Sequence, residues 1–213
     1  MARQSNFVNT EWTPELAYVV GLFASDGNLS PDGRHLSFCS KDKDLPVIIK
    51  KILKLHNTIG RKARGGSKKK LYYVFQFGSR QFYNFLLSIG LTPHKSKTIA
   101  ALKVPDEYFA DFLRGCFDGD GSITKTMHPE SKHAQLRFSI YSASPKFLSW
   151  LLAKHKQLWH IEGGWIYMDK KKLVGSLCYG KRDATQILKH IYQNKNSFCL
   201  KRKQITAAKY LGE

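Results

Sequence analysis

Apolar and polar residues alternate with regular periods along most of the chain, and these periods predict its helices and strands. The residues from Pro14 to Ser25 are apolar nearly all round and predict a buried helix, with Thr13 as its N-cap. Strict alternation from Gly33 to Ser40 predicts a half-buried strand, because successive strand side chains point to opposite faces. The other patterns of this half predict helices over 44–57 and 80–89, and strands over 59–64 and 71–77.

The same order of elements returns in the second half of the chain. Helical patterns cover 106–119, 145–159 and 183–192, strands are predicted over 122–126 and 135–141, and 164–179 is predicted to form a hairpin. Each half therefore runs helix, two strands, helix, two strands, helix. This order predicts an α+β fold made of two αββαββα halves.

The repetition extends to individual residues. Four positions return at a constant offset of 94, so that Gly21, Phe23, Asp26 and Gly27 become Gly115, Phe117, Asp120 and Gly121. Two further blocks return in the same order, 77–80 as 179–182 and 95–101 as 201–207. The chain is a duplication. We divide it into an N-terminal half (1–91), a short basic connector (92–105) and a C-terminal half (106–213), related by pseudo-twofold symmetry.

The charge balance indicates the class of partner. The 213 residues include 35 Lys and Arg against 16 Asp and Glu, which gives a formal charge of +19 and a pI near 9.8. Such a protein is expected to bind a polyanion, and nucleic acid is the leading candidate. Charge alone does not distinguish a nucleic-acid enzyme from a ribosomal protein or a membrane-surface binder.

Other classes are disfavoured by what the sequence lacks. The four cysteines lie far apart, without the spacing of a zinc site, and are expected to be reduced. No apolar run approaches the roughly 18 residues of a membrane span, and residues 1–10 lack the pattern of a secretion signal. We expect an intracellular protein that does not bind a membrane, in a compartment that the sequence does not specify.

The opening helix of each half carries small residues on one stripe. Gly21 and Ser25 are four positions apart, as are Gly115 and Gly119, so each pair lies on one helical face. Small residues let helix axes approach closely. We therefore expect the two helices to pack against each other and to bring the aspartates that end them, Asp26 and Asp120, close together.

Two neighbouring carboxylates at helix C-termini need an explanation. A single Asp-Gly pair is usually a tight turn. A matched pair is different, because negative charge there opposes the helix dipole, and two like charges raise each other's pKa unless a cation lies between them. Mg²⁺ binds one or two carboxylates together with substrate phosphate, and paired metal sites stabilise the attacking and leaving oxygens of phosphodiester displacement. The pair Asp26 and Asp120 therefore predicts a metal site that acts on a phosphodiester.

The two helices resemble the namesake motif of the LAGLIDADG homing endonucleases, in the single-chain form with two motifs. The matching segments are 19–27 (VVGLFASDG) and 113–121 (LRGCFDGDG). The first is the looser copy, with Ala24 and Ser25 where the family pattern has Asp and Ala. The last acidic position is Asp in both copies. The resemblance extends over nearly the whole chain, including the closing segment 200–203.

The resemblance implies a fold, an activity and a cofactor. The fold is a saddle of two antiparallel four-stranded sheets along DNA, with the motif helices at its centre. The activity is hydrolysis of both strands near the middle of a long site by a monomer, in the context of intron homing, without a covalent intermediate. The cofactor is Mg²⁺, which Mn²⁺ or Ca²⁺ can replace in binding. Asp26 and Asp120 are the implied catalytic metal ligands, and the carbonyls of Ser25 and Gly119 are candidate further ligands.

The family often has a basic or polar side chain just after the second strand of each half. That position is Lys41 in the first half and Ala143 in the second. Lys41 is a candidate catalytic residue that positions water or stabilises charge, and a solvated lysine at a helix start is the equally weighted alternative. Ala143 puts a symmetric role in doubt.

Strand alternation predicts which side chains face DNA, because a two-stranded ribbon fits the major groove and can distinguish all four base pairs there. The candidates on strands are Asn28, Ser30, His35, Ser37, Tyr72, Val74, Gln76, Lys125, Gln135, Arg137, Ser139, Tyr141, Trp165, Tyr167 and Ser176. The basic candidates are Arg34, Arg61, Arg64, Arg80, Lys171 and Arg182. In the basic turns 61–70 and 169–172 we expect contact with phosphate rather than with bases. Each of these side chains could instead be an ordinary solvent-facing residue.

The sequence predicts one function and leaves two alternatives open. We expect a site-specific endonuclease acting on double-stranded DNA at a non-palindromic target, because the two halves differ at the reading positions. An intron RNA maturase would have the same charge and fold. A DNA-binding regulator that lost the chemistry is the other alternative, and the Asp retained at both motif ends argues against it.

Overall fold

The computed structural model describes residues 7–64, 67–127, 134–169, 171 and 173–211. The first half contains α1 (Pro14–Ser25), β1 (Gly27–Leu29), β2 (His35–Ser40), α2 (Asp44–Ile52), β3 (Ile59–Arg64), β4 (Ser67–Gly78) and α3 (Arg80–Ser88). Two short 3-10 turns follow, η1 (Lys95–Lys97) and η2 (Asp106–Tyr108). The second half contains α4 (Phe109–Asp120), β5 (Gly121–Met127), β6 (Ala134–Ser142), α5 (Pro145–Trp159), β7 (Trp165–Asp169), β8 (Val174–Tyr179), α6 (Lys181–Tyr192) and α7 (Lys201–Leu211).

Each half forms one four-stranded antiparallel sheet, as predicted. The strand orders are β1-β2-β4-β3 and β5-β6-β8-β7, which are the same order in the two halves. The registers also correspond, since Asn28 pairs with Ser37 and the equivalent Ser122 pairs with Ser139. The duplication seen in the sequence is therefore a duplication of structure.

One face of each sheet is covered by helices and the other is open. Phe38, Phe75, Phe138 and Leu177 are fully buried on the covered faces, as the alternation predicts. On the open face of the first sheet, Asn28 and Gln76, which both pair with Ser37, are exposed.

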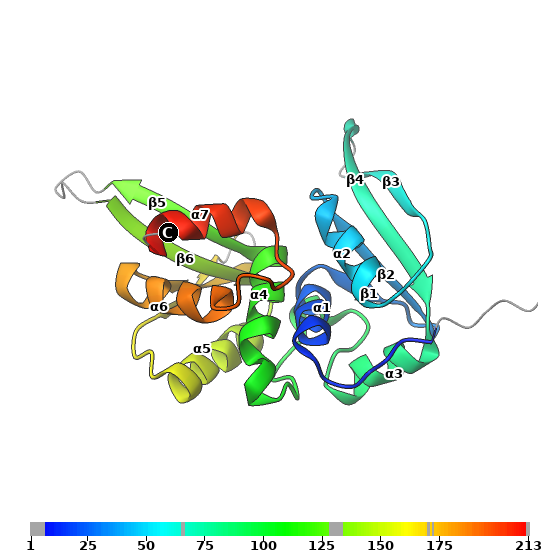
Figure 1. Cartoon of the computed structure of the whole chain (residues 1–213), viewed down its shortest axis with the longest axis horizontal. Helices are drawn as coiled ribbons and strands as arrows, with labels where there is room; N and C mark the ends of the chain where they lie inside the picture. Colours follow the sequence, from blue (N-terminus) through cyan, green and yellow to red (C-terminus); the bar gives the residue numbers. More distant parts are fainter. Residues whose placement is uncertain (1–6, 65–66, 128–133, 170, 172, 212–213) are drawn as a thin grey trace, which may run out of the picture.

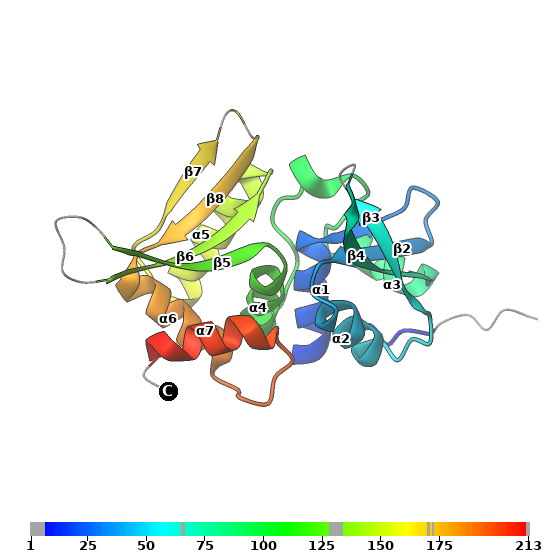
Figure 2. The same cartoon turned by 90° about the horizontal axis from the view of Figure 1, so that it is seen from above.

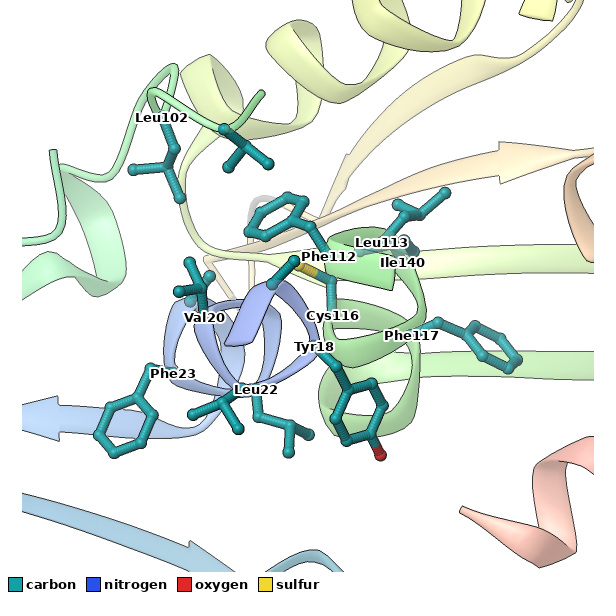
Figure 3. Close-up of a cluster of buried hydrophobic side chains, with 14 of the residues drawn as sticks. Tyr18, Val20, Leu22, Phe23, Leu102, Phe112, Leu113, Cys116, Phe117 and Ile140 are labelled. Atoms are coloured by element: carbon teal, nitrogen blue, oxygen red, sulfur yellow. The ribbon is translucent and has the colours of Figure 1, made fainter. Parts of the chain in front are cut away.

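Helices α1 and α4 lie side by side at the centre, with one sheet on either side of them (Figures 1 and 2). Thr13 caps α1 by accepting a hydrogen bond from the N–H of Leu16 at 3.1 Å. Apolar side chains radiate from both helices into one continuous core, among them Phe23 from α1 and Phe117 from α4 (Figure 3). Phe117 stacks on Phe138 of the second sheet, with ring centroids 4.7 Å apart.

Some boundaries differ from those predicted. Helix α2 ends at Ile52 instead of reaching residue 57, and Lys54 then takes a left-handed conformation (φ 51°) that turns the chain away. Strand β4 begins at Ser67, earlier than expected, and the closing segment forms an additional helix, α7. Among the described residues, no helix is long and apolar enough to span a membrane.

Candidate active site

The two motif helices touch backbone to backbone at Gly21 and Gly115. A Cβ on Gly21 would lie 2.0 Å from the carbonyl oxygen of Phe112, and a Cβ on Gly115 would lie 2.1 Å from that of Tyr18. No side chain fits in this gap. The small-residue stripe therefore does what the sequence predicted and lets the two helix axes come as close as their backbones allow.

This contact sets the position of the two motif aspartates. Asp26 is the C-cap of α1, and Asp120 is the last residue of α4. The Oδ2 of Asp26 lies 3.4 Å from the place that a Cβ on Gly119 would occupy, so its carboxylate sits against the end of the opposite helix. Both aspartates are half-buried.

Two buried lysines that were not predicted lie at the same helix ends. Lys95 of η1 is 6% exposed, and its Nζ donates hydrogen bonds to the carbonyl oxygens of Gly27, at 2.7 Å, and Ser25, at 3.2 Å. Carbonyls at a helix C-terminus carry partial negative charge, which a cation stabilises. Lys95 thus holds the end of α1 from outside the helix.

Lys203 of α7 does the same for α4. It is 7% exposed, and its Nζ donates to the carbonyl oxygens of Gly121, at 2.7 Å, and Asp118, at 3.0 Å, and also to that of Phe117. The glycine bonded by Lys203 is the counterpart of the glycine bonded by Lys95. The two lysines are therefore structural equivalents, although the repeated blocks 95–101 and 201–207 align Lys95 with residue 201.

Burial lowers the pKa of both lysines. The pKa of Lys203 falls to about 8, and that of Lys95 also falls below its usual value. The carboxylates of Asp120 and Asp26 oppose this effect at Lys95, which shows that both acidic groups lie near one ammonium group. The helix ends thus combine two carboxylates with two buried cations.

The second motif carries a polar network that the first lacks. Asp118 is 1% exposed and stands where the first motif has Ala24; its Oδ2 accepts hydrogen bonds from the Tyr18 hydroxyl at 2.8 Å and the Leu200 N–H at 2.6 Å. Burial raises the pKa of Asp118, and these bonds oppose the rise. The network ties α1, α4 and the start of α7 together.

The donor atoms at the helix ends fit a hard divalent cation. Asp26 and Asp120 supply carboxylate oxygens, and the C-terminal ends of α1 and α4 present main-chain carbonyls. The carbonyl of Ser25 accepts one bond from Lys95, which leaves a second lone pair. Across the described residues, no group of three or more His, Cys, Asp or Glu side chains could hold a metal ion. Carboxylate and carbonyl oxygens are the ligand type that Mg²⁺ takes together with water and phosphate.

Most of the predicted DNA-facing side chains of the strands lie on the open faces. In the first half these include Asn28, His35, Ser37 and Gln76, which lie at or near the surface. In the second half the register groups the open-face residues Gln135, Arg137, Tyr141, Ser176, Trp165 and Tyr167. Of these, the aromatic residues Tyr141, Trp165 and Tyr167 are exposed, and the guanidinium of Arg137 lies 5.5 Å from the Trp165 ring centre.

Two of the predicted strand positions are wrong in orientation or exposure. Lys125 pairs with Leu136 and lies on the helix side, so its neighbour Thr124 occupies the open face. Ser139 is on the open face but only 2% exposed. Arg61, which was predicted in a basic turn, lies on β3, where it is exposed and donates a hydrogen bond to the Tyr73 hydroxyl at 3.1 Å.

The other predicted residues are distributed around the sheets. Ser30 lies in the turn after β1, where its carbonyl accepts a hydrogen bond from the Tyr83 hydroxyl at 2.6 Å, while Tyr72 and Val74 are half-buried on β4. Among the basic residues predicted for the site, Arg34, Lys41, Arg80, Lys171 and Arg182 are exposed. The side chain of Arg64 lies outside the described part of the structure.

The comparisons with known proteins agree with this geometry. Residues 13–90 match the family model described as a LAGLIDADG-like domain. An uncharacterised protein of Methanocaldococcus jannaschii, MJ0398, is 27% identical over 128 residues, which cover 57% of this chain and 44% of the relative. The chain thus spans less than half the length of that protein.

Two solved structures share the fold over nearly the whole chain. The I-SmaMI LAGLIDADG homing endonuclease bound to cleaved DNA superposes with a TM-score of 0.60 at 14% identity, covering 97% of this chain and 90% of that one. The N-terminal LAGLIDADG domain of DUF199/WhiA superposes with a TM-score of 0.55 at 17% identity, covering 95% and 92%. These likenesses establish the fold and leave the activity open. Residues 13–90 thus match a LAGLIDADG-like domain, and both halves together share the fold of the LAGLIDADG homing endonucleases.

Proposed function

We propose that this protein is a site-specific, metal-dependent endonuclease that hydrolyses both strands of a long, non-palindromic double-stranded DNA target. The main support is the pair of carboxylates at the adjacent ends of α1 and α4, both close enough to Lys95 to affect its pKa. A protein with a charge of +19 attracts DNA. The polar and aromatic open faces offer hydrogen-bonding and stacking groups to the major groove.

In this proposal Asp26 and Asp120 hold divalent metal, with the carbonyls of Ser25 and Gly119 as further ligands. The bound metal would polarise the phosphate and lower the pKa of water. The buried ammonium groups of Lys95 and Lys203 offset the negative charge of the carboxylates and of an incoming phosphate. Because they are already fixed by main-chain carbonyls, they need no rearrangement when DNA binds.

The two open faces orient the duplex so that its central phosphates reach the helix ends. A strand rises about 3.3 Å per residue, so two sheets end to end span roughly 15 base pairs at about 3.4 Å per step. Side chains differ between the halves, with amide and hydroxyl groups such as Gln76 and Ser37 on the first sheet and Trp165 and Tyr167 on the second. Each half therefore recognises a different sequence.

The test is a cleavage selection from a plasmid library with a randomised insert and Mg²⁺. Asp26→Asn and Asp120→Asn are each expected to lower the cleavage rate at the selected site by at least about 100-fold while leaving DNA binding largely unchanged. Asp106→Asn is the matched control, because this exposed aspartate pairs with Lys154 at the far end of α4. Its cleavage rate should equal that of the wild type.

Other outcomes would identify the rivals. Full cleavage by both aspartate variants would refute the metal-binding roles. Tight, sequence-selective duplex binding without any cleavage by the wild type would indicate a regulator. Preferential binding of intron RNA without cleavage of any library member would indicate a maturase.

A further inference from the structure

We infer that the open face of the second sheet binds the unpaired bases of a single nucleic-acid strand by stacking. This activity goes beyond the cleavage of duplex DNA and does not depend on it. It is carried by three exposed aromatic rings, those of Tyr141, Trp165 and Tyr167, which lie around a floor of small residues.

The strand register places a small side chain between two aromatic ones. Tyr141 of β6 pairs with Ser176 of β8, and Ser176 pairs in turn with Tyr167 of β7, so the three residues form one row across the open face. Neighbouring strands lie about 4.8 Å apart, so the backbones that carry the two tyrosines are about 10 Å apart. One base stacked between two rings needs about 7 Å, because stacked aromatic planes lie about 3.4 Å apart. The row thus leaves room for one base above Ser176.

The floor between the rings is polar. In the next row Ser139 pairs with Cys178, and Cys178 pairs with Trp165, so small residues again lie beside an aromatic one. The hydroxyl of Ser139 lies 3.4 Å from the thiol of Cys178, and that thiol lies 3.4 Å from the hydroxyl of Ser176. Ser176 is the half-buried member of this chain of contacts, and its hydroxyl can donate to or accept from the edge of a base.

Two contacts hold the rings in place before any ligand binds. The Tyr141 hydroxyl shares a hydrogen bond of 3.3 Å with the hydroxyl of Ser122 on β5, which lies on the opposite side of β6 from β8. The guanidinium of Arg137 lies 5.5 Å from the Trp165 ring centre, and the Trp165 side is still 46% exposed. An arginine in this position supports the ring and attracts a phosphate. Side chains that are already ordered lose less entropy when a ligand binds.

The first sheet has the opposite arrangement. Its equivalent row is Cys39, Val74 and Gly60, in which the largest side chain is central and neither outer residue carries a ring. The aromatic row therefore belongs to the second half and does not follow from the duplicated backbone.

Bases that are paired in a duplex cannot use these rings for stacking. Their neighbours cover both faces of each base, and the major groove shows only base edges. Single strands expose base faces, and the proteins that bind them combine aromatic side chains with positive charge. Arg137 and the exposed Lys171, in the turn after β7, supply such charge. Asp169, which alternates to the same face, lies at the far end of β7 and accepts a hydrogen bond from the N–H of Lys171 at 3.0 Å.

The experiment measures the binding of dye-labelled single strands of about 12 nucleotides to the full chain by fluorescence anisotropy, with EDTA present so that nothing is cut. The probes are a DNA strand, an RNA strand of the same sequence, and a DNA strand with abasic sites throughout, which keeps the phosphates and lacks the bases. The abasic strand should bind at least about tenfold more weakly than the intact DNA. Similar affinities for DNA and RNA would support recognition of base faces alone, and a preference of about tenfold or more for one of them would identify that strand as the ligand.

Substitutions locate the binding on this face. Tyr167→Ala and Trp165→Ala should each weaken binding of the intact strand about tenfold, and Tyr167→Phe, which keeps the ring, should stay within about twofold of the wild type. Phe7→Ala is the matched control, because it removes a ring that is 76% exposed and precedes α1, outside the second sheet. Its affinity should equal that of the wild type.

Equal affinities for the intact and abasic strands, or unchanged affinities of both alanine variants, would overturn the inference. A loss of affinity confined to duplex targets with thymines at this face would overturn it too, and would assign the rings to thymine methyl groups in the major groove. These results would leave the proposed endonuclease standing, because cleavage is measured separately on duplex plasmids. A failure to cut any library member, together with base-dependent binding of single strands, would overturn the proposed function and support this inference.

Discussion

Replacing Gly115 by alanine tests the contact on which the candidate active site depends. The new Cβ would lie 2.1 Å from the carbonyl oxygen of Tyr18 and 2.9 Å from the backbone nitrogen of Leu22. Both opposing atoms belong to the backbone of α1, so no side chain can rotate away to make room. The two helices must separate, and the apolar contacts around them must shift.

The cost follows from the size of this clash. Overpacking a well-packed interior lowers the free energy of unfolding by about 1–3 kcal/mol. We expect about 3 kcal/mol here, because a clash against backbone is relieved only if a helix moves. For a chain of roughly 150–250 residues, each kcal/mol lowers the Tm by about 2–4 °C. We therefore expect Gly115→Ala to lower the Tm by roughly 6–12 °C. Cleavage should fall further, by about 100-fold, because separated helices displace Asp26 and Asp120.

Thermal unfolding followed by circular dichroism measures the first effect, and the plasmid assay at a temperature where the variant is folded measures the second. Gly60→Ala on β3 is the matched control, since the nearest atom to its new Cβ is the carbonyl oxygen of Val74 at 4.0 Å. Its Tm should stay within about 2 °C of the wild type. An equally small change for Gly115→Ala would refute the backbone contact as the determinant of helix spacing.

Three further predictions concern buried polar groups. Tyr18→Phe removes the hydroxyl that donates to buried Asp118, and should lower the free energy of unfolding in urea by about 1–3 kcal/mol; a smaller loss would mean that water replaces the bond. Burial lowers the pKa of His155 to about 3, so between pH 6.5 and pH 3 the unfolded state binds more protons than the folded state. The free energy of unfolding should therefore fall as the pH drops from 6.5 towards 3. His155→Leu should show a flatter dependence on pH. Burial lowers the pKa of Lys203 to about 8, so the charged ammonium destabilises the folded state, and this destabilisation should disappear as the pH rises from 8 towards 10. The difference in free energy of unfolding between the wild type and Lys203→Met, measured at pH 8 and at pH 10, checks this. An unchanged difference would contradict it.

Much of the fold could be predicted from the sequence because local and long-range signals agree. The apolar periods located the helices and most strands, and α5 was predicted to its last residue. The repeat at Gly21 and Gly115 predicted the central helix pair, because only a close approach explains glycine at both positions in a buried helix. The α7 helix was not predicted, since its pattern is dominated by basic residues and its apolar face is short.

The parts of the site that were not predicted from the sequence share one physical cause. Lys95 and Lys203 lie in basic stretches where most lysines are solvated. Only the three-dimensional structure shows that their Nζ atoms reach main-chain carbonyls at the ends of α1 and α4. Strand facing was misjudged at Lys125 because a shift of one residue moves a side chain to the other face. The hydrophobic pattern thus predicted most helices and strands, whereas the contacts of single polar side chains could not be predicted from the sequence.

The two halves retain symmetry where the packing of the central helices requires it and lose it at many positions of the open faces. Gly21 with Gly115, and Lys95 with Lys203, are matched because each supports the packing or the polar ends of the central helices. Ala143 breaks the match with Lys41 at a half-buried position just after β6. It follows that substitutions at the central helices should change cleavage of both strands together, and should change stability as well. Substitutions of exposed open-face residues such as Gln76 and Trp165 should instead change the preferred target sequence at nearly constant stability, so the two groups of variants separate the scaffold from recognition.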